Sequence, residues 1–298
     1  MAPITSLLLV DKPVGVTSFS SLSPIKREIE RKVGHAGTLD KFAHGLMIVL
    51  TGNMTKLNTI FSTLDKKYRA TFEFGKITDT LDPEGEVTAT GSIPTLEEIQ
   101  SAIDEHFIGP IDQIPPKYSA IHVNGKRAYS LVRAGKEVEL ISREITIYSI
   151  EIIDYEPPFL TLTIHCSKGT YIRSLARDIA AMCGTVAYVS ALERTHIGPY
   201  CVTESVDAHN KEMVIESVSN TKNLLHRLGC MGTVIVSKEA IIPLSHGNLP
   251  KEEYIMKRMI SKESKYAIVE SQEKEMLAIV NLDLEDNRKI VSSVAILK

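Results

Sequence analysis

Long apolar runs and paired cysteines are both absent from this chain of 298 residues. No stretch approaches the roughly 18 consecutive apolar residues that a membrane-spanning helix needs, so we expect no span. The short run Leu7–Val10 meets Asp11 and Lys12 at once, with no basic segment before it and no small-residue cleavage site after it. That pattern is not typical of a signal peptide, and we expect a cytoplasmic protein.

The four cysteines, Cys166, Cys183, Cys201 and Cys230, include no Cys-x-x-Cys pair and lie near no histidine cluster in the sequence. Zinc sites and disulfide frameworks both rely on ligands at regular, close spacings. We therefore expect buried free thiols rather than a metal site or disulfides.

A strong excess of positive charge is missing as well, because the formal net charge is -3. A protein that coats nucleic acid by charge alone would be markedly basic. One segment, residues 117–136, nevertheless has no acidic residue and carries the basic residues Lys117, Lys126, Arg127, Arg133 and Lys136. Such a run is typical of a solvated face, and it also suits phosphate binding.

The hydrophobic pattern that is present predicts an α+β fold. Apolar and polar residues alternate over 68–74, which is the period of a half-buried strand. We expect one helix to begin at Thr95, another over 171–182, and a third through Val33 with Ser18 as its N-cap. Further strands are predicted at 5–10, 46–50, 145–153, 159–166, 186–192 and 196–202, and further helices at 57–64 and 207–229.

Composition divides the chain into a larger domain, residues 1–230, and a smaller one, residues 231–298. The smaller part consists of short β-rich segments joined by polar turns, which predicts a separate β domain. Residues 110–143 are rich in proline, glycine and basic side chains and are expected to leave the larger domain as a surface excursion. Long excursions of this kind are often functional.

Two segments carry the strongest chemical signals. The loop Gly34-His35-Ala36-Gly37-Thr38-Leu39-Asp40 has glycines that permit sharp backbone angles, and it presents a histidine and an aspartate together. Its alternative interpretation is a turn in which Asp40 accepts from a nearby N–H. In the second segment, residues 168–178, a strand end precedes a helix start, where Arg173 can pair with a carboxylate or a phosphate.

The glycine-rich loop, followed by Gly45, resembles the signature of TruB-type pseudouridine synthases, which convert uridine 55 in the T-loop of tRNA to pseudouridine. Other segments resemble the family's remaining motifs, in order, over residues 9–202: Asp11-Lys12-Pro13 with Thr17-Ser18, Lys67-Tyr68, Thr78-Asp79-Thr80 with Asp82-Pro83-Glu84-Gly85, Pro115–Ala120 with Val123–Tyr129, Gly169–Arg173, and Leu192–Thr195. Each motif alone is weak, whereas the ordered series is specific. The sequence departs from the family at Lys41, Phe42 and His44, where Pro, Leu, and Thr or Ser are usual.

The resemblance implies a pseudouridine synthase fold, in which a central mixed, mainly antiparallel sheet is flanked by helices. Residues 1–230 would form the catalytic domain, with residues 110–143 as an RNA-gripping insertion. Residues 231–298 resemble a small PUA-like RNA-binding domain.

The resemblance also assigns roles to residues. Asp40 would be the essential carboxylate, Arg173 would pair with it, and Tyr68 would stack on the target base and handle a proton. Residues expected to contact the substrate or shape its pocket are His35, which fills the space left by the extruded base, Tyr171 and Leu192 in the pocket, and Lys12, Lys126 and Arg127 along the RNA.

The reaction breaks a glycosidic C–N bond, turns the base and forms a C–C bond, so no redox step, metal or cofactor is expected. Three routes stay open for Asp40: attack at C1′, addition to C6 of the base, and removal of a sugar proton to give a glycal. The expected partner is the T-arm stem-loop of tRNA, bound by a monomer that needs no obligate protein partner.

Three alternatives remain. A related synthase could act on ribosomal RNA within a guide-RNA particle, but the 115–140 insertion and the lack of long basic tails favour a stand-alone tRNA enzyme. A non-catalytic RNA-binding or RNA-folding protein would not need Asp40, Tyr68 and Arg173 together. A hydrolase using Asp40 would need a second catalytic carboxylate, and none stands out.

Overall fold

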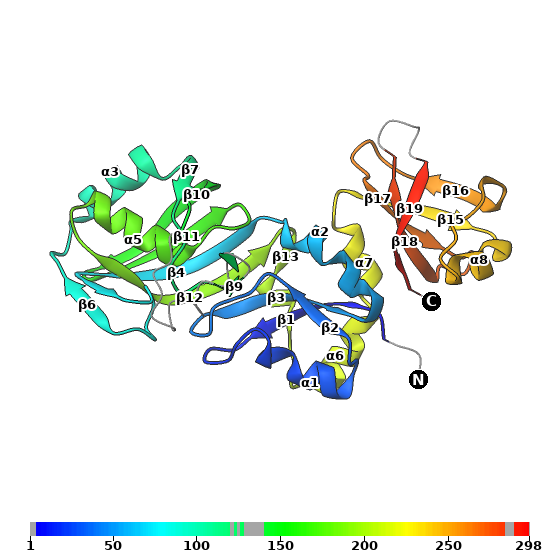
Figure 1. Cartoon of the computed structure of the whole chain (residues 1–298), viewed down its shortest axis with the longest axis horizontal. Coiled ribbons are helices and arrows are strands. Elements are labelled where there is room, and N and C mark those ends of the chain that lie inside the picture. The colour runs from blue at the N-terminus through cyan, green and yellow to red at the C-terminus, as the bar shows by residue number, and fades with distance from the viewer. Residues whose placement is uncertain (1–3, 120–121, 124–125, 128–139, 284–288, 298) are drawn as a thin grey trace.

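The computed structural model describes residues 4–119, 122–123, 126–127, 140–283 and 289–297. Two β-sheets dominate it, a large one built from the N-terminal three quarters of the chain and a small one at the C-terminus (Figure 1). Within the described ranges, no helix has the length and apolar character needed to cross a membrane.

The large sheet has ten strands in the order β14-β1-β3-β12-β4-β11-β10-β7, with β2 paired to β3 and β13 to β12. The pairs β1–β14 and β3–β12 are parallel and the other pairs are antiparallel, which confirms the mixed, mainly antiparallel sheet. The strands are β1 (Leu7–Lys12), β2 (Val33–Ala36), β3 (His44–Thr51), β4 (Lys66–Phe74), β7 (Gly109–Gln113), β10 (Arg143–Glu156), β11 (Phe159–Cys166), β12 (Ala187–Ile197), β13 (Tyr200–Cys201) and β14 (Val206–Asp207).

One face of the large sheet is covered by α3 (Leu96–His106) and α5 (Ile172–Met182). The alternation over 68–74 is confirmed, because Tyr68, Ala70, Phe72 and Phe74 all enter the apolar core beneath these helices. Thr95 caps α3 as predicted, and its side chain and that of Glu98 form a reciprocal capping box.

The larger part also contains four short helices: α1 (Ser23–Glu28), α2 (Asn58–Ser62), α6 (Lys211–Val218) and α7 (Thr221–His226). Two further pairs of strands each form a two-stranded sheet: β5 (Lys76–Thr78) with β6 (Val87–Thr90), and β8 (His122–Val123) with β9 (Lys126–Arg127).

The prediction that Ser18 caps the first helix is wrong. The helix begins at Ser23 after a 3-10 turn, and the Ser18 hydroxyl bonds to Leu39 instead. The helix also ends at Glu28 and does not reach Val33, which begins β2.

Other boundaries also differ from the predictions. The helix expected over 207–229 is two helices, α6 and α7. The expected strands 186–192 and 196–202 are largely one strand, β12, in which two register shifts absorb the irregular pattern. Residues Gly109–Gln113 form the edge strand β7 paired to β10, so the excursion expected from residue 110 leaves the sheet only after Gln113.

The C-terminal sheet has five strands in the order β16-β15-β17-β18-β19, namely β16 (Ile255–Met259), β15 (Met231–Val236), β17 (Tyr266–Glu270), β18 (Met276–Leu282) and β19 (Ile290–Ile296). A short helix, α8 (Ile241–Ser245), packs against it. Sequence patterning missed β16, whose side chains are mostly exposed and include Lys257 and Arg258.

The two sheets share an apolar cluster at their junction, where α2 and α7 lie between them (Figure 1). Phe61 and Leu224 from the larger part pack in one cluster with Ile268 and Ile279 from the smaller. The Lys222 ammonium also pairs with the buried Glu270 carboxylate at 2.8 Å. All four cysteines are free thiols, of which Cys166 is fully buried and the others half-buried.

Candidate active site

Asp40 lies on the connection between β2 and β3, between two glycines that the backbone geometry requires. Gly37 has φ +90° and Gly45 has φ +109°, values that side-chain-bearing residues rarely adopt. At Gly45, an added Cβ would also lie 2.5 Å from the Arg194 carbonyl oxygen. The loop is therefore pressed directly against β12.

Buried polar side chains hold this loop from beneath. The Ser18 hydroxyl lies 2.8 Å from both the N–H and the carbonyl oxygen of Leu39, next to Asp40. The guanidinium of Arg194, which is 1% exposed, donates to the carbonyls of Leu46 at 2.8 Å and Gly37 at 3.1 Å. Arg194 lies in one of the family-like motifs, but the sequence did not predict that its guanidinium binds the backbone of the Asp40 loop.

Arg173, near the start of α5, forms the predicted pair with Asp40. Its Nη2 donates to Asp40 Oδ1 at 3.1 Å, and its Nε lies 2.9 Å from Oδ2, off the hydrogen-bond axis. The Arg173 side chain is 5% exposed, whereas that of Asp40 is 35% exposed. The carboxylate is thus anchored on one side and open to solvent on the other.

The same guanidinium binds a second carboxylate, Asp82, which belongs to one of the family-like motifs but had received no role from the sequence. Arg173 Nη1 lies 3.1 Å from Asp82 Oδ2 and donates to the Thr80 carbonyl at 2.9 Å. Burial raises the pKa of Asp82, while a hydrogen bond from Thr80 and the charge of Arg173 oppose that rise. Because Asp82 and Asp40 share one arginine, the Asp82 turn is part of the site.

Tyr68 and Leu192 belong to the same apolar cluster as Leu39, which places them beneath the Asp40 loop. Tyr68 is 8% exposed, and burial raises the pKa of its phenol to about 12. The nearby Arg194 guanidinium opposes that rise and the Asp40 charge adds to it. Tyr68 is therefore a neutral phenol at physiological pH, close enough to Asp40 to sense its charge.

A residue that the sequence did not reveal, Gln113, positions the start of α5. Its side-chain amide accepts from the Tyr171 N–H at 2.8 Å and donates to the Tyr171 carbonyl at 3.1 Å. Gln113 is 1% exposed and ends β7. The Tyr171 ring, which is half-buried, lies under the Arg143 guanidinium at 5.2 Å. The Gln113 amide fixes the backbone two residues before Arg173.

His35 and Lys12, both expected at the substrate, have different surroundings. Burial, together with the charge of Arg194, lowers the pKa of His35, and its Nδ1 is buried without a hydrogen-bond partner. Lys12 is fully buried, and its ammonium donates to the carbonyls of Pro13 at 2.9 Å, Val16 at 2.7 Å and Lys41 at 3.4 Å. These intramolecular partners tie Lys12 to the loop, and its expected contact with substrate stays a prediction.

The other expected RNA contacts, Lys126 and Arg127, form the short strand β9 paired with β8, and their side chains lie outside the described residues. Among the described residues, no group of His, Cys, Asp and Glu side chains is arranged to hold a metal ion.

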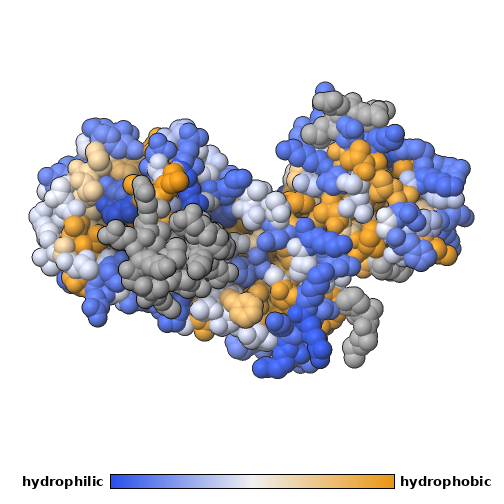
Figure 2. Space-filling model, in the orientation of Figure 1, coloured by the Kyte–Doolittle hydropathy of each residue, from blue (hydrophilic) through white to orange (hydrophobic). Residues whose placement is uncertain are grey.

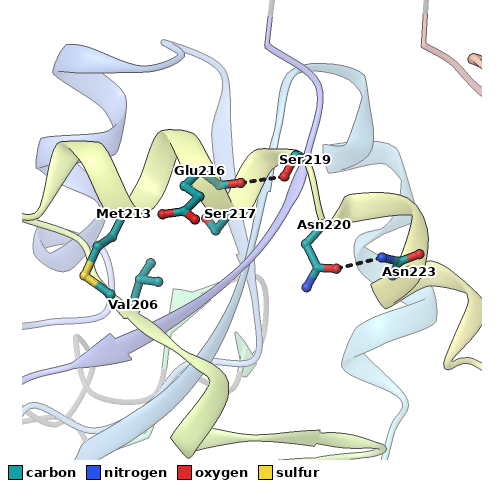
Figure 3. A pocket seen from close by; sticks show the side chains of 7 residues that line it. All are labelled: Val206, Met213, Glu216, Ser217, Ser219, Asn220 and Asn223. Atoms are coloured by element: carbon teal, nitrogen blue, oxygen red, sulfur yellow. Dashed lines mark hydrogen bonds between the residues drawn. The ribbon is translucent and has the colours of Figure 1, made fainter.

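A depression of about 370 Å³ beside α6, shown in Figure 3, has no lining residue in common with the Asp40 site. Its lining residues are Val206, Met213, Glu216, Ser217, Ser219, Asn220 and Asn223. In Figure 3, the polar atoms of Ser219 and Asn223 bond to groups of this same set.

Comparisons of the sequence and the fold with known proteins lead to the same family as the sequence motifs. The family described as TruB family pseudouridylate synthase (N terminal domain) has a model that matches residues 26–172. The tRNA pseudouridine synthase B of Borreliella burgdorferi (strain ZS7) is 46% identical over 207 residues, covering 68% of this chain and 73% of that protein. The protein of the same name from Borreliella afzelii (strain PKo) is 39% identical over 290 residues, covering 95% and 98%.

A crystal structure of a Cbf5–Nop10–Gar1 complex contains a chain with the same fold. It superposes with a TM-score of 0.67 at 23% identity and covers 98% of this chain and 85% of that one. The fold and the sequence matches together define a pseudouridine synthase, an isomerase. Within that class, the chain belongs to the TruB family.

Proposed function

We propose that this protein converts uridine 55 in the T-loop of tRNA to pseudouridine, with Asp40 as the essential carboxylate. The observation that carries the proposal is the Asp40–Arg173 pair, in which a solvent-accessible carboxylate is held by a buried guanidinium. An adjacent positive charge favours the ionised carboxylate, which is the form that a nucleophile or a base needs. The names of the relatives from Borreliella, which specify tRNA, support the substrate class.

In the reaction, the bond between N1 of the base and C1′ of the ribose breaks, and a bond between C5 and C1′ forms. The proton on C5 is lost and N1 gains one, so atoms and charge balance without a cofactor. Asp40 acts by attack on C1′, by addition to C6, or by removal of a sugar proton, and all three need its oxygen at the nucleoside. Tyr68, a neutral phenol, would stack on the base and pass the proton.

The uridine must leave the folded T-loop to reach Asp40, and extrusion costs about a few kcal/mol. His35 would occupy the space that the base leaves, and its lowered pKa supports an uncharged ring there at neutral pH. Leu192 and Tyr171 would line the pocket. Phosphate contacts by Lys126 and Arg127 would supply compensating binding energy.

The proposal extends to the whole chain. Residues 1–230 would be the catalytic domain and residues 231–298 a PUA-like RNA-binding domain, acting together as a monomer. Since tRNA is the substrate, the protein would work in the cytoplasm without an obligate protein partner.

The proposal is tested by tritium release from a tRNA transcript that carries 5-tritiated uridine. Asp40→Asn should abolish release while tRNA binding is largely kept, because the amide has nearly the same shape but cannot attack or accept a proton. Asp178→Asn is the matched control. It is also an aspartate-to-asparagine change, but it lies on α5, and among the described residues the Asp178 carboxylate pairs only with Arg177. Full turnover by Asp40→Asn, or release from a transcript lacking uridine 55, would refute the proposal.

A further inference from the structure

The segment between β1 and α1 exposes apolar side chains beside the Asp40 loop. Phe19 is 69% exposed and Val14 61% exposed. Figure 2 shows small apolar patches among hydrophilic surface on the lower part of the larger body, where Figure 1 places this segment. A single exposed aromatic residue is common on protein surfaces, so its neighbours decide what it does.

The segment is tied to the loop that carries Asp40. The Gly15 N–H donates to the Lys41 carbonyl at 2.9 Å, and Ser18, directly before Phe19, binds Leu39 through its hydroxyl at 2.8 Å. These bonds reach the residues on either side of Asp40. Phe19 therefore extends from a backbone whose position is coupled to the active-site loop.

The segment is also held in one conformation. The Thr17 hydroxyl accepts from the Ser20 N–H at 3.0 Å and lies 2.7 Å from the Ser20 hydroxyl, on either side of Phe19. The Lys12 ammonium binds the Pro13 and Val16 carbonyls from within. A side chain presented by a preorganised backbone loses little entropy when a ligand covers it.

The charge around Phe19 indicates what covers it. The Lys26 ammonium lies over one face of the Phe19 ring, 5.4 Å from the ring centre, and Lys26 is itself exposed at the end of α1. An aromatic ring with a cation over one face suits a nucleotide, because a base can stack on the opposite face while a phosphate of the same strand meets the ammonium. A purely apolar partner would instead leave Lys26 desolvated and unpaired.

From this geometry we infer that Phe19 and Lys26 form a stacking site for an unpaired RNA base next to the extruded uridine. Phe19 supplies the face on which the base lies, and Lys26 pairs with a phosphate of that strand. The inference rests on the proposed function, because it takes the RNA to be the substrate that Asp40 acts on.

The chain contains no tryptophan, so Phe19→Trp provides a single fluorescent reporter at the proposed site. Its emission should be quenched saturably by a T-arm stem-loop RNA, because a base stacked on an indole quenches it. Phe159→Trp is the matched control, since Phe159 is 43% exposed at the far end of β11, and its emission should not change. If the indole emission of the Phe19→Trp variant stays constant while RNA binds, the inference is overturned.

Turnover gives the second readout. Phe19→Ala should raise KM about 5- to 150-fold, the range that one stacked base is worth, while Phe19→Tyr should keep KM near the wild-type value.

Lys26→Gln should lower the slope of log KM against log salt by about 0.7 to 0.9, as for one lost phosphate contact. An unchanged KM for Phe19→Ala, with an active wild type, would refute the stacking site alone. An inactive wild type would refute the proposed function, and quenching of the Phe19→Trp variant would still report whether RNA stacks there.

Discussion

At the residue scale, one buried guanidinium organises the site. Arg173 binds Asp40 and Asp82 as well as the carbonyls of Thr80 and Tyr118, so both of its terminal nitrogens have two hydrogen-bond partners. A lysine in this place would keep the charge but could not hold two carboxylates in a fixed plane. The arginine therefore fixes the orientation of Asp40 in addition to its charge.

Lys12 gives a pH-dependent prediction at this scale. Burial lowers the pKa of Lys12 from 10.5 to about 8, so the unfolded chain holds more protons than the folded chain between those pH values. Stability should therefore rise by up to about 1.4 kcal/mol per pH unit from this residue as pH increases through that window, and fall as pH drops back toward 8. Urea unfolding of wild type and Lys12→Met across pH 7–10 isolates the contribution. Parallel curves for the two proteins would contradict it.

At the element scale, β12 and the Asp40 loop act as one unit because Gly45 lies against the Arg194 backbone. Hydrophobic period and capping predicted β4 and α3, whereas the same reasoning divided β12 into two strands. The roles of Ser18, Gln113 and Asp82 could not be predicted, since each depends on a partner 21, 58 or 91 residues away. A local pattern contains no information about such distant partners. The sequence predicted Ser18 as a helix cap, placed Gln113 in a surface excursion and gave Asp82 only as part of a family motif.

Gly45 provides the test of that unit. Gly45→Ala should destabilise the fold and reduce turnover, because it adds both strain at φ +109° and a clash 2.5 Å from the Arg194 carbonyl. Gly184→Ala is the matched control, with φ +67° and no neighbour within 4 Å, so it should show strain of about 1 kcal/mol and keep turnover. Equal loss of activity in the two variants would mean that backbone strain, and not the contact with β12, is responsible.

At the scale of the whole molecule, the two sheets are joined by a shared core and not only by a linker. The Asn53 side chain donates to the Ile296 carbonyl at 2.8 Å, close to the apolar cluster that holds Phe61 and Ile279. Apolar burial of this kind couples the unfolding of neighbouring bodies. We therefore expect a single calorimetric transition for the wild-type chain.

The Lys222–Glu270 pair at this joint predicts an asymmetric result. Glu270 is 4% exposed, whereas Lys222 is 29% exposed and keeps part of its hydration. Lys222→Met leaves a buried carboxylate without its partner and should destabilise by about 3 kcal/mol, the low end of what such a loss costs. Glu270→Gln leaves a partly hydrated ammonium and should cost less. Calorimetry of both variants checks this. Lys222→Met should lower the melting temperature more than Glu270→Gln and split the single transition into two. Equal shifts would show that the joint depends on the apolar cluster alone.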